Sequence, residues 1–335
     1  FVDLSNSLYV QIIEPILAGI DKDRFQKLCI VPDGILWRLN FELLARTKAG
    51  CKNYKCSDYL LNHFAIHYAY SATNQFENRT KQSATSKPIM AFSYGETDVN
   101  DGDVISMNKL RSVNEELPGS RAEIKAISEF MAGDYYFGEL ASEKQFKDKS
   151  SAYQILHLAV HGETDDLNPK NSKLFFYSEG DTLEDGYLHA YELFDMKLNA
   201  DLAVLSACEN GTGKIANGEG LLSLGRAFSH AGVHSVVLTM WKVSDAFTPA
   251  IIENFYKELK KGKSKSEALR TAKLTFLKNS DNISSPPFYW GSFYALGDDQ
   301  PISFKSEISW WMIATAAVCF LSLTVAVIQK QKVAS

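Results

Sequence analysis

The sequence has little of what marks several classes of protein. Five cysteines scattered over 335 residues do not form the dense framework of a small disulfide-rich domain. Acidic residues outnumber basic ones by 40 to 35, so no positive surplus indicates a nucleic-acid surface, and we expect no nucleic-acid partner. The chain starts at Phe1, with neither a methionine nor an apolar signal stretch, and we therefore expect the C-terminal part of a longer protein. What remains is the composition of a globular domain, 45% hydrophobic and 22% charged, which excludes disorder and collagen.

One long apolar run stands out near the C-terminus. Residues 310–328 carry no charge, and a helix of that length spans roughly 28 Å, close to the thickness of a bilayer's hydrocarbon core. Trp310 and Trp311 suit an interfacial aromatic belt. The run predicts a single-pass transmembrane helix, and the alternative is a buried core helix. We expect a domain over 1–299, a linker over 300–309, the span over 310–328 and a basic tail over 329–335.

The charges beside this run bear on its orientation. Lys305 precedes the run, whereas Lys330 and Lys332 follow it. The positive-inside rule therefore favours, by one charge, a cytoplasmic tail and an extracytoplasmic domain. A tail-anchored protein would have the opposite orientation.

Upstream, strand-like and helix-like runs alternate. The strand candidates are short and rich in Val, Ile and Leu, which is typical of strands buried on both faces of a mainly parallel sheet. They are Leu28–Val31, Phe64–Tyr70, Ile89–Ser93, Ile155–Val160, Leu174–Tyr177, Leu202–Ala207 and Ser235–Thr239. Helical patterns lie between them, over Ser120–Met131, Leu221–Ala231 and Asp245–Lys261, and a further one starts after Ser264. Capping boxes are predicted at Ser120 with Glu123 and at Ser264 with Glu267. The alternation predicts an α/β fold of three layers.

Two of the predicted strands end in residues that can carry chemistry. The strand from Ile155 ends at His161 and Gly162, and the strand from Leu202 ends at Cys208, which is followed by a glycine-rich stretch to Gly220. In open α/β sheets, active sites collect beyond the carboxyl ends of the strands. If the two strands are neighbours, His161 and Cys208 face each other there.

A histidine beside a cysteine is the pair that a cysteine peptidase needs. The thiolate is the attacking species, and a nearby histidine can take the thiol proton and return it to the leaving amine. The backbone N–H groups of Gly162 and Cys208 could stabilise the oxyanion. The alternative is that Cys208 is only a small buried hydrophobic residue.

Further motifs support the first reading. Several motifs resemble the CHAT domain family in order and spacing. They are His161-Gly162, Leu205-Ser-Ala-Cys208-Glu, the downstream runs Gly218-Glu-Gly220, Trp241-Lys-Val-Ser-Asp245 and Trp290-Gly-Ser-Phe293, and the upstream runs Ile30–Gly34 and Phe41-Glu42. Asn40 departs from the family, which commonly has proline there. The resemblance implies a caspase-like (caspase–haemoglobinase) fold, a cysteine endopeptidase with His161 and Cys208 as the dyad, protein or peptide substrates, and upstream TPR repeats with an activating partner.

One specificity residue and one rival function follow. The resemblance extends to separases, in which an acidic residue after the next strand helps to select a basic P1 side chain; Asp245 stands there, although it could instead cap a helix. The rival function is a catalytically silent CHAT module that serves as a peptide-binding, protein-binding or signalling scaffold.

No cofactor and no metal are expected. The run Gly211–Lys214 lacks the Walker A residues at positions 208 and 215. The group Cys51, Cys56, His63 and His67 has the wrong spacing for a zinc finger.

Overall fold

The structure is a computed structural model, and it describes residues 1–21, 24–48, 54–77, 87–94, 118–165, 167–178, 184–206, 219–241, 244 and 246–304. The chain divides into two units, Phe1–Ile302 and Ser303–Ser335, and nearly all described residues belong to the first. None of the helices in the described ranges is long and apolar enough to cross a membrane. The expected span, residues 310–328, lies outside the described residues.

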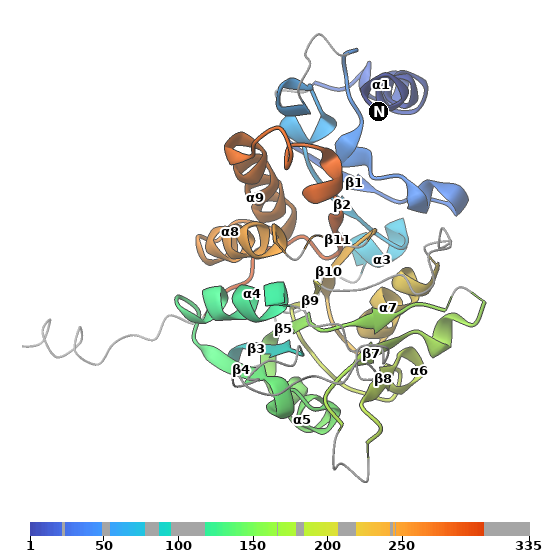
Figure 1. The fold of residues 1–335 in the computed structure, drawn as a ribbon. Coiled ribbons are helices and arrows are strands. Elements are labelled where there is room, and N and C mark those ends of the chain that lie inside the picture. The colour runs from blue at the N-terminus through green and yellow to red at the C-terminus, as the bar shows by residue number, and fades with distance from the viewer. Residues whose placement is uncertain are drawn as a thin grey trace, which may run out of the picture. The chain divides into compact units, whose positions relative to one another are not determined.

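A sheet of eight strands forms the centre of the described part of the chain, in the order β1-β2-β11-β10-β9-β5-β3-β4 (Figure 1). Its strands are β1 (Lys27–Ile30), β2 (Ala65–Tyr68), β3 (Lys87–Ser93), β4 (Gly133–Phe137), β5 (Tyr153–Ala159), β9 (Leu202–Leu205), β10 (Ser235–Thr239) and β11 (Phe293–Gly297). A second sheet contains β6 (Gly162–Glu163), β7 (Lys173–Phe175) and β8 (Tyr187–His189). The strand candidates of the sequence are thus confirmed as strands, with small shifts at their ends.

The large sheet consists of two groups of parallel strands. Strands β10, β9, β5, β3 and β4 run in one direction, and β11, β2 and β1 run in the other, so that the described strands meet antiparallel only between β10 and β11. The predicted, mostly parallel sheet is therefore confirmed. Because β11 is reversed, its last residues lie beside the first residues of β10, with Gly297 opposite Ser235.

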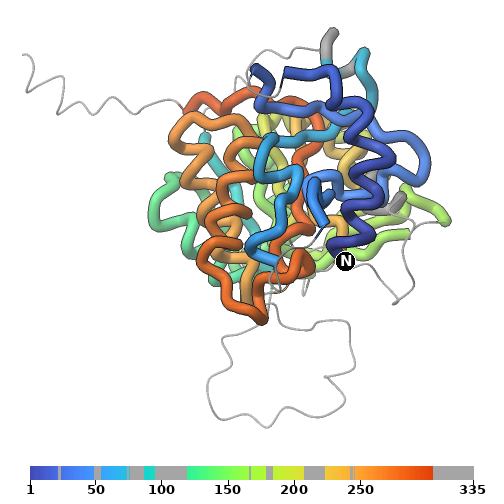
Figure 2. The backbone as a smooth tube through the Cα atoms, turned by 90° about the horizontal axis from the view of Figure 1, so that it is seen from above, coloured from blue at the N-terminus to red at the C-terminus, as the bar shows by residue number. Residues whose placement is uncertain are grey.

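Helices cover both faces of the sheet, which confirms the predicted three layers. Helices α4, α8 and α9 pack on one face, and α7 lies with α6 on the other (Figure 1). The N-terminal helical segment lies on the side opposite to α8 and α9, as Figure 2 also shows. The helices are α1 (Val2–Leu8), the π-helical Tyr9–Ile13, α2 (Glu14–Leu17), α3 (Ala72–Glu77), α4 (Pro118–Ser128), α5 (Glu143–Lys149), α6 (Ala190–Leu193), α7 (Glu219–His230), α8 (Thr248–Lys260) and α9 (Lys265–Asn279).

The two predicted capping boxes have different outcomes. At the start of α9, Ser264 accepts from the N–H of Glu267 and the Glu267 carboxylate accepts from the N–H of Ser264 at 3.1 Å, so this box is confirmed. At α4 the prediction was wrong, because the helix begins at Pro118 and Ser120 lies inside it. The Ser120 hydroxyl contacts that of Ser93 at 2.9 Å instead. Tertiary contacts therefore replaced the local cap.

A buried ion pair ties the N-terminal region to α9. Glu42 and Lys273 are both fully buried and contact each other, and Lys273 also donates to the carbonyl of Phe293 in β11. Burial raises the pKa of the Glu42 carboxyl and lowers the pKa of the Lys273 ammonium, each opposed by the charge of the other group. Asn40, where the family commonly has proline, caps the adjacent short helix by accepting from the N–H of Glu42 at 3.0 Å. The departure at Asn40 therefore leaves the turn intact.

Candidate active site

Strand β5 carries His161 to the carboxyl edge of the sheet. All seven residues of this strand are buried, as expected for its run of apolar side chains. His161 follows two residues after the last residue of the strand, and its side chain is also buried, with 6% of the residue exposed. The predicted position of His161 at a strand's carboxyl end is confirmed.

The small second sheet orients the backbone at Gly162. The N–H of Phe175 donates to the carbonyl of His161 at 2.8 Å, and Gly162 lies opposite Leu174. In an antiparallel pair, hydrogen-bonded and non-hydrogen-bonded positions alternate, so the Gly162 N–H points away from β7. A backbone N–H directed away from its own sheet, one residue after His161, suits an oxyanion donor.

Strand β9 is the neighbour of β5, as the predicted dyad requires. The two strands are parallel with Leu158 opposite Leu205, and the N–H of Ser206 donates to the carbonyl of Leu158 at 3.2 Å. His161 is three residues beyond Leu158, and Cys208 is three residues beyond Leu205. Cys208 itself lies outside the described residues.

The next strand bears on the expected specificity residue. Strand β10 pairs with β9 with Leu238 opposite Leu205, so the strand that leads towards Asp245 has the expected position. Asp245 lies outside the described residues. Helix α8 begins at Thr248 with Phe247 as its N-cap, whereas the sequence predicted a start at Asp245. The helix therefore begins three residues later than predicted.

The acidic loop after His161 is held by its own backbone. The Asp165 carboxylate accepts from the N–H groups of Asn168 at 2.8 Å and Leu167 at 2.9 Å, and these bonds, led by that of Asn168, lower the pKa of Asp165. Glu163 pairs with Lys173 of β7 at 3.2 Å. These two carboxylates therefore stabilise the loop.

Sequence reasoning missed a buried polar group behind the site. His157, four residues before His161 on β5, contacts Glu123 of α4 through Nε2 at 3.0 Å and the Tyr256 hydroxyl of α8 through Nδ1 at 2.9 Å. All three residues are buried, and burial raises the pKa of Tyr256 well above its ordinary value. His157 is therefore a histidine packed inside the core. Glu123, however, was assigned to a capping box, because its spacing from Ser120 matched one.

The described residues offer no convincing metal centre. Among them, the carboxylates of Glu143, Glu184 and Glu192 lie close enough to share an ion, but the ammonium of Lys147 already contacts them at 2.6, 2.6 and 2.8 Å. A lysine thus supplies the positive charge at this cluster.

The weighed zinc group is divided among other partners. Cys56 is disulfide-bonded, and Cys51 lies outside the described residues. His63 contacts Asp58 at 2.5 Å, and the ring of His67 contacts Gln75 at 3.3 Å.

The chain is similar to known proteins both in sequence and in structure. The chain is 23% identical to human tetratricopeptide repeat protein 28, over 90% of this chain and 13% of that protein, and 24% identical to the mouse protein, over 57% of this chain and 9% of that protein. It therefore spans only a small fraction of the length of these relatives.

Among solved structures, the Arg-specific cysteine proteinase gingipain R is similar with a TM-score of 0.47 at 9% identity, covering 90% of this chain and 67% of gingipain R. Saccharomyces cerevisiae separase, in its complex with securin, is similar with a TM-score of 0.43 at 13% identity, covering 73% of this chain and 14% of separase. The model of the CHAT domain family matches residues 2–298. With the α/β sheet, the strand-terminal His161 and this match over nearly all of the globular unit, the chain belongs to the CHAT domain family.

Proposed function

We propose that this chain is a membrane-anchored cysteine endopeptidase that hydrolyses peptide bonds of protein substrates through His161 and Cys208. The observation that carries the proposal is the pairing of β5 with β9, in which Leu158 and Leu205 are opposite each other. The two residues of the dyad follow these positions by the same number of residues, at the edge where parallel α/β sheets place their chemistry.

In the proposed reaction, the His161 imidazole takes the thiol proton of Cys208, and the thiolate attacks the carbonyl carbon of the substrate. The N–H groups of Gly162 and Cys208 donate to the oxyanion that forms. His161 then protonates the leaving amine as the C–N bond breaks and leaves an acyl-enzyme. Water, deprotonated by His161, hydrolyses the thioester and restores the thiol.

The proposed substrate pocket includes Asp245, three residues before the start of α8 and six beyond the end of β10. A carboxylate there would pair with an arginine side chain at P1 through two charge-assisted hydrogen bonds, which favours Arg over Lys. A peptide library with P1 varied tests this assignment on the wild type and on Asp245→Asn. We expect an Arg preference that falls by about tenfold or more in the variant. An unchanged P1 profile would remove Asp245 from the pocket.

The dyad itself is tested by thiol labelling with an iodoacetamide probe. We expect rapid modification of Cys208 in the wild type and slow modification in His161→Ala, because the histidine generates the thiolate. Cys29 provides an internal control, since it is a free thiol at an exposed position of β1. The pKa of this thiol is raised, first by partial desolvation and then by the charge of Asp299, so we expect it to label slowly. Labelling of Cys208 at the same rate with and without His161 would contradict the dyad.

A catalytically silent scaffold is the second candidate function. The curated relatives are named for tetratricopeptide repeats, and their name mentions no peptidase activity. In either function, upstream repeats of this kind would recruit a protein substrate or an activating partner. Peptide binding without turnover, with Cys208 slow to label, would favour the scaffold.

The proposed anchor is the apolar run over 310–328. We expect the full chain to float with phosphatidylcholine vesicles after a carbonate wash, and a variant with Leu321, Val325 and Val327 replaced by Asp to lose this behaviour. Lys305 on one side, and Lys330 and Lys332 on the other, keep an extracytoplasmic domain as the proposed orientation. Digestion of the domain by protease in inside-out vesicles would contradict this orientation.

A further inference from the structure

The small second sheet begins directly after His161. Strand β6 starts at Gly162, β7 pairs with β6, and β8 pairs with β7, each antiparallel to its neighbour. Leu174 of β7 and Leu188 of β8 are fully buried, so one face of this sheet packs into the core. Because side chains alternate along a strand, the residues on either side of these leucines form the opposite, outer face.

The outer face carries aromatic side chains in a row that starts at His161. The N–H of Phe175 donates to the carbonyl of His161 at 2.8 Å, which continues the register of β6 and β7 and places these two residues opposite each other. Phe175 is in turn opposite Tyr187, and opposite residues share a face. The two rings are in edge contact with their centroids 5.2 Å apart, and Tyr187 is 40% exposed. We call Phe175 and Tyr187 the β7–β8 aromatic pair.

The neighbouring row of this face contributes a lysine. The Nζ of Lys173 lies 4.7 Å from the ring centroid of Tyr187 and 5.5 Å from that of Phe175. The Glu163 carboxylate pairs with the same ammonium at 3.2 Å. The charge of Lys173 is thus balanced within the sheet, and the β7–β8 aromatic pair offers a ligand an apolar contact.

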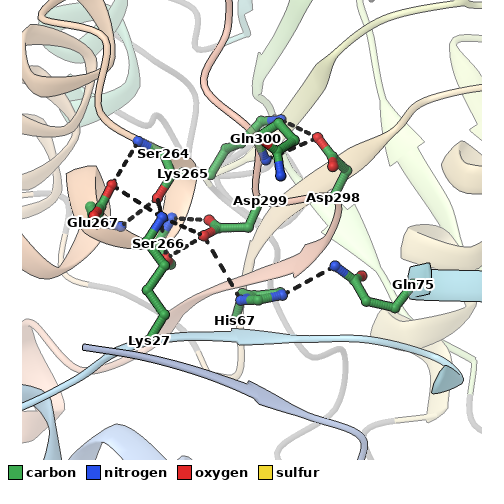
Figure 3. A network of polar contacts seen from close by, with 10 residues as sticks. All are labelled: Lys27, His67, Gln75, Ser264, Lys265, Ser266, Glu267, Asp298, Asp299 and Gln300. Carbon is green, nitrogen blue, oxygen red and sulfur yellow. Dashed lines mark hydrogen bonds and ion pairs between the residues drawn. The ribbon is translucent and has the colours of Figure 1, made fainter. Parts of the chain in front are cut away.

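The polar network around Asp299 differs from this face, because its charges are paired within the chain (Figure 3). Asp299 accepts from the N–H of Ser266 at 2.7 Å and from its hydroxyl at 2.8 Å. The Lys27 ammonium contacts Asp299 at 3.3 Å and Glu267 at 3.2 Å. These charges hold segments of the chain together, whereas the ring of Tyr187 is accessible to a partner.

The chemistry proposed for His161 determines which part of a substrate lies beside the β7–β8 aromatic pair. The imidazole protonates the leaving amine, whose nitrogen belongs to P1′, the first residue after the scissile bond. A proton donor must lie within about 3 Å of that nitrogen. The substrate residues after the scissile bond, its primed side, therefore start beside His161.

The spacing of the small sheet sets how far along the substrate the contact falls. Neighbouring strands lie about 4.8 Å apart, so Tyr187, two strands away from His161, is roughly 10 Å from it along the row. An extended peptide advances about 3.3 Å per residue, so roughly three residues cover that distance. A side chain at P2′ or P3′ is then within reach of the β7–β8 aromatic pair.

We propose that the β7–β8 aromatic pair binds the primed side of a protein substrate, an inference that rests on the proposed peptidase function. A large apolar side chain at P2′ or P3′ packs on the rings, and an aromatic one is preferred because edge and offset contacts between rings add to the burial of apolar area. The occupant is the substrate itself, because the row of side chains is continuous with His161.

Two reporter substrates, used on the full chain, separate the primed side from the rest of the site. Both carry the P1 residue that the wild type prefers in the peptide library described above. One substrate ends there in an aminomethylcoumarin leaving group and has no primed residues. The other is an internally quenched peptide with Phe at P2′ and P3′, and only this substrate can contact the β7–β8 aromatic pair.

For Tyr187→Ala we expect kcat/KM to fall about tenfold or more on the quenched peptide, because the variant loses apolar surface that contributes to binding. On the coumarin substrate the same variant should match the wild type, which also shows that the site is folded. Tyr187→Phe keeps the ring and should keep both activities. Phe25→Ala is the matched control, since it removes a 48% exposed ring beside β1, at the far end of the large sheet, and it should change neither activity.

Three results would overturn the proposal. Equal losses of Tyr187→Ala on both substrates would place its effect at the dyad or in folding. A quenched peptide with Gly at P2′ and P3′ that is cleaved as fast as the Phe peptide would exclude a contact with the rings. A change in the sedimentation of Tyr187→Ala with unchanged kinetics would assign the surface to a second copy of the chain. Failure of the proposed peptidase function is distinct, because the wild type would then cleave neither substrate.

Discussion

The two edges of the large sheet use polar groups in opposite ways. At the edge where β10 begins, the Asp299 carboxylate accepts from the backbone and side chain of Ser266 and contacts Lys27. At the edge where β5 ends, His161 is buried beside a glycine whose N–H points away from its own sheet. The first edge uses its charges to hold distant segments together, whereas the second carries the imidazole of His161 and the backbone N–H of Gly162, which belong to the proposed active site. The comparison predicts that mutations at one edge change stability and that those at the other change activity.

The largest expected effect is on activity at the His161 edge. Cys208→Ala and His161→Ala should each lower kcat/KM by about a thousandfold or more, and the double variant should be little worse, because the two residues act as one unit. Both variants should still be folded at the assay temperature, as far-ultraviolet circular dichroism measures. Cys29→Ala, which removes the free thiol of edge strand β1, is the matched control and should keep full activity. Residual activity of Cys208→Ala within tenfold of the wild type would contradict a catalytic role for this edge of the sheet.

The next effect is on stability at the Asp299 edge. Asp299→Ala should cost about 2–3 kcal/mol in the free energy of unfolding, because it leaves the buried N–H and hydroxyl of Ser266 without their acceptor. Urea denaturation measures this, and kcat should stay near that of the wild type below the melting transition. Asp195→Ala, at an exposed position of the chain, should stay within about 0.5 kcal/mol. Equal costs for the two variants would remove the special role of the Asp299 network.

The buried group between the edges should behave as structure. Tyr256→Phe removes only the hydroxyl that contacts His157 Nδ1, so it should cost about 1–2 kcal/mol. Thermal unfolding measures the loss. A control, Tyr187→Phe, changes an exposed tyrosine and should have almost no effect. If Tyr256→Phe instead lowered kcat at unchanged stability, the His157 group would act on His161 rather than on the core.

The smallest effect is a pH dependence at the Asp299 edge. Burial lowers the pKa of His67, so near pH 6 the unfolded chain binds more protons than the folded one. This contribution to stability is therefore present above the unfolded pKa of about 6.5 and is lost as the pH falls below it. Between pH 7.5 and pH 5.5 the wild type should lose more stability than His67→Gln, as measured by urea midpoints. An equal loss in both would mean that His67 does not carry the dependence.

Local pattern predicted the parts of the molecule that depend on local energies. Strand β10 and the capping box of α9 follow from short apolar runs and from a side chain three residues from its backbone partner. The same pattern was wrong at Glu123, because the carboxylate of Glu123 contacts the buried His157 on β5 instead of an N–H group at the start of α4. The sequence pattern also placed the start of α8 three residues too early, because an acidic residue close to a helix start has the signature of an N-cap.

By itself, the sequence predicted seven of the described strands, because burial periodicity and end signals are encoded within a few residues. It offered no candidate for β4, β6, β8 or β11. His161 and Cys208 were predicted in this way to be site residues, as endings of apolar runs. Only the tertiary structure decided the long-range partners. The pairing of β5 with β9, the insertion of β11 between β10 and β2, and the contacts of Asp299 with Ser266 join residues far apart in the chain. Such contacts depend on which surfaces pack together once the whole sheet has formed, and no local pattern encodes that choice.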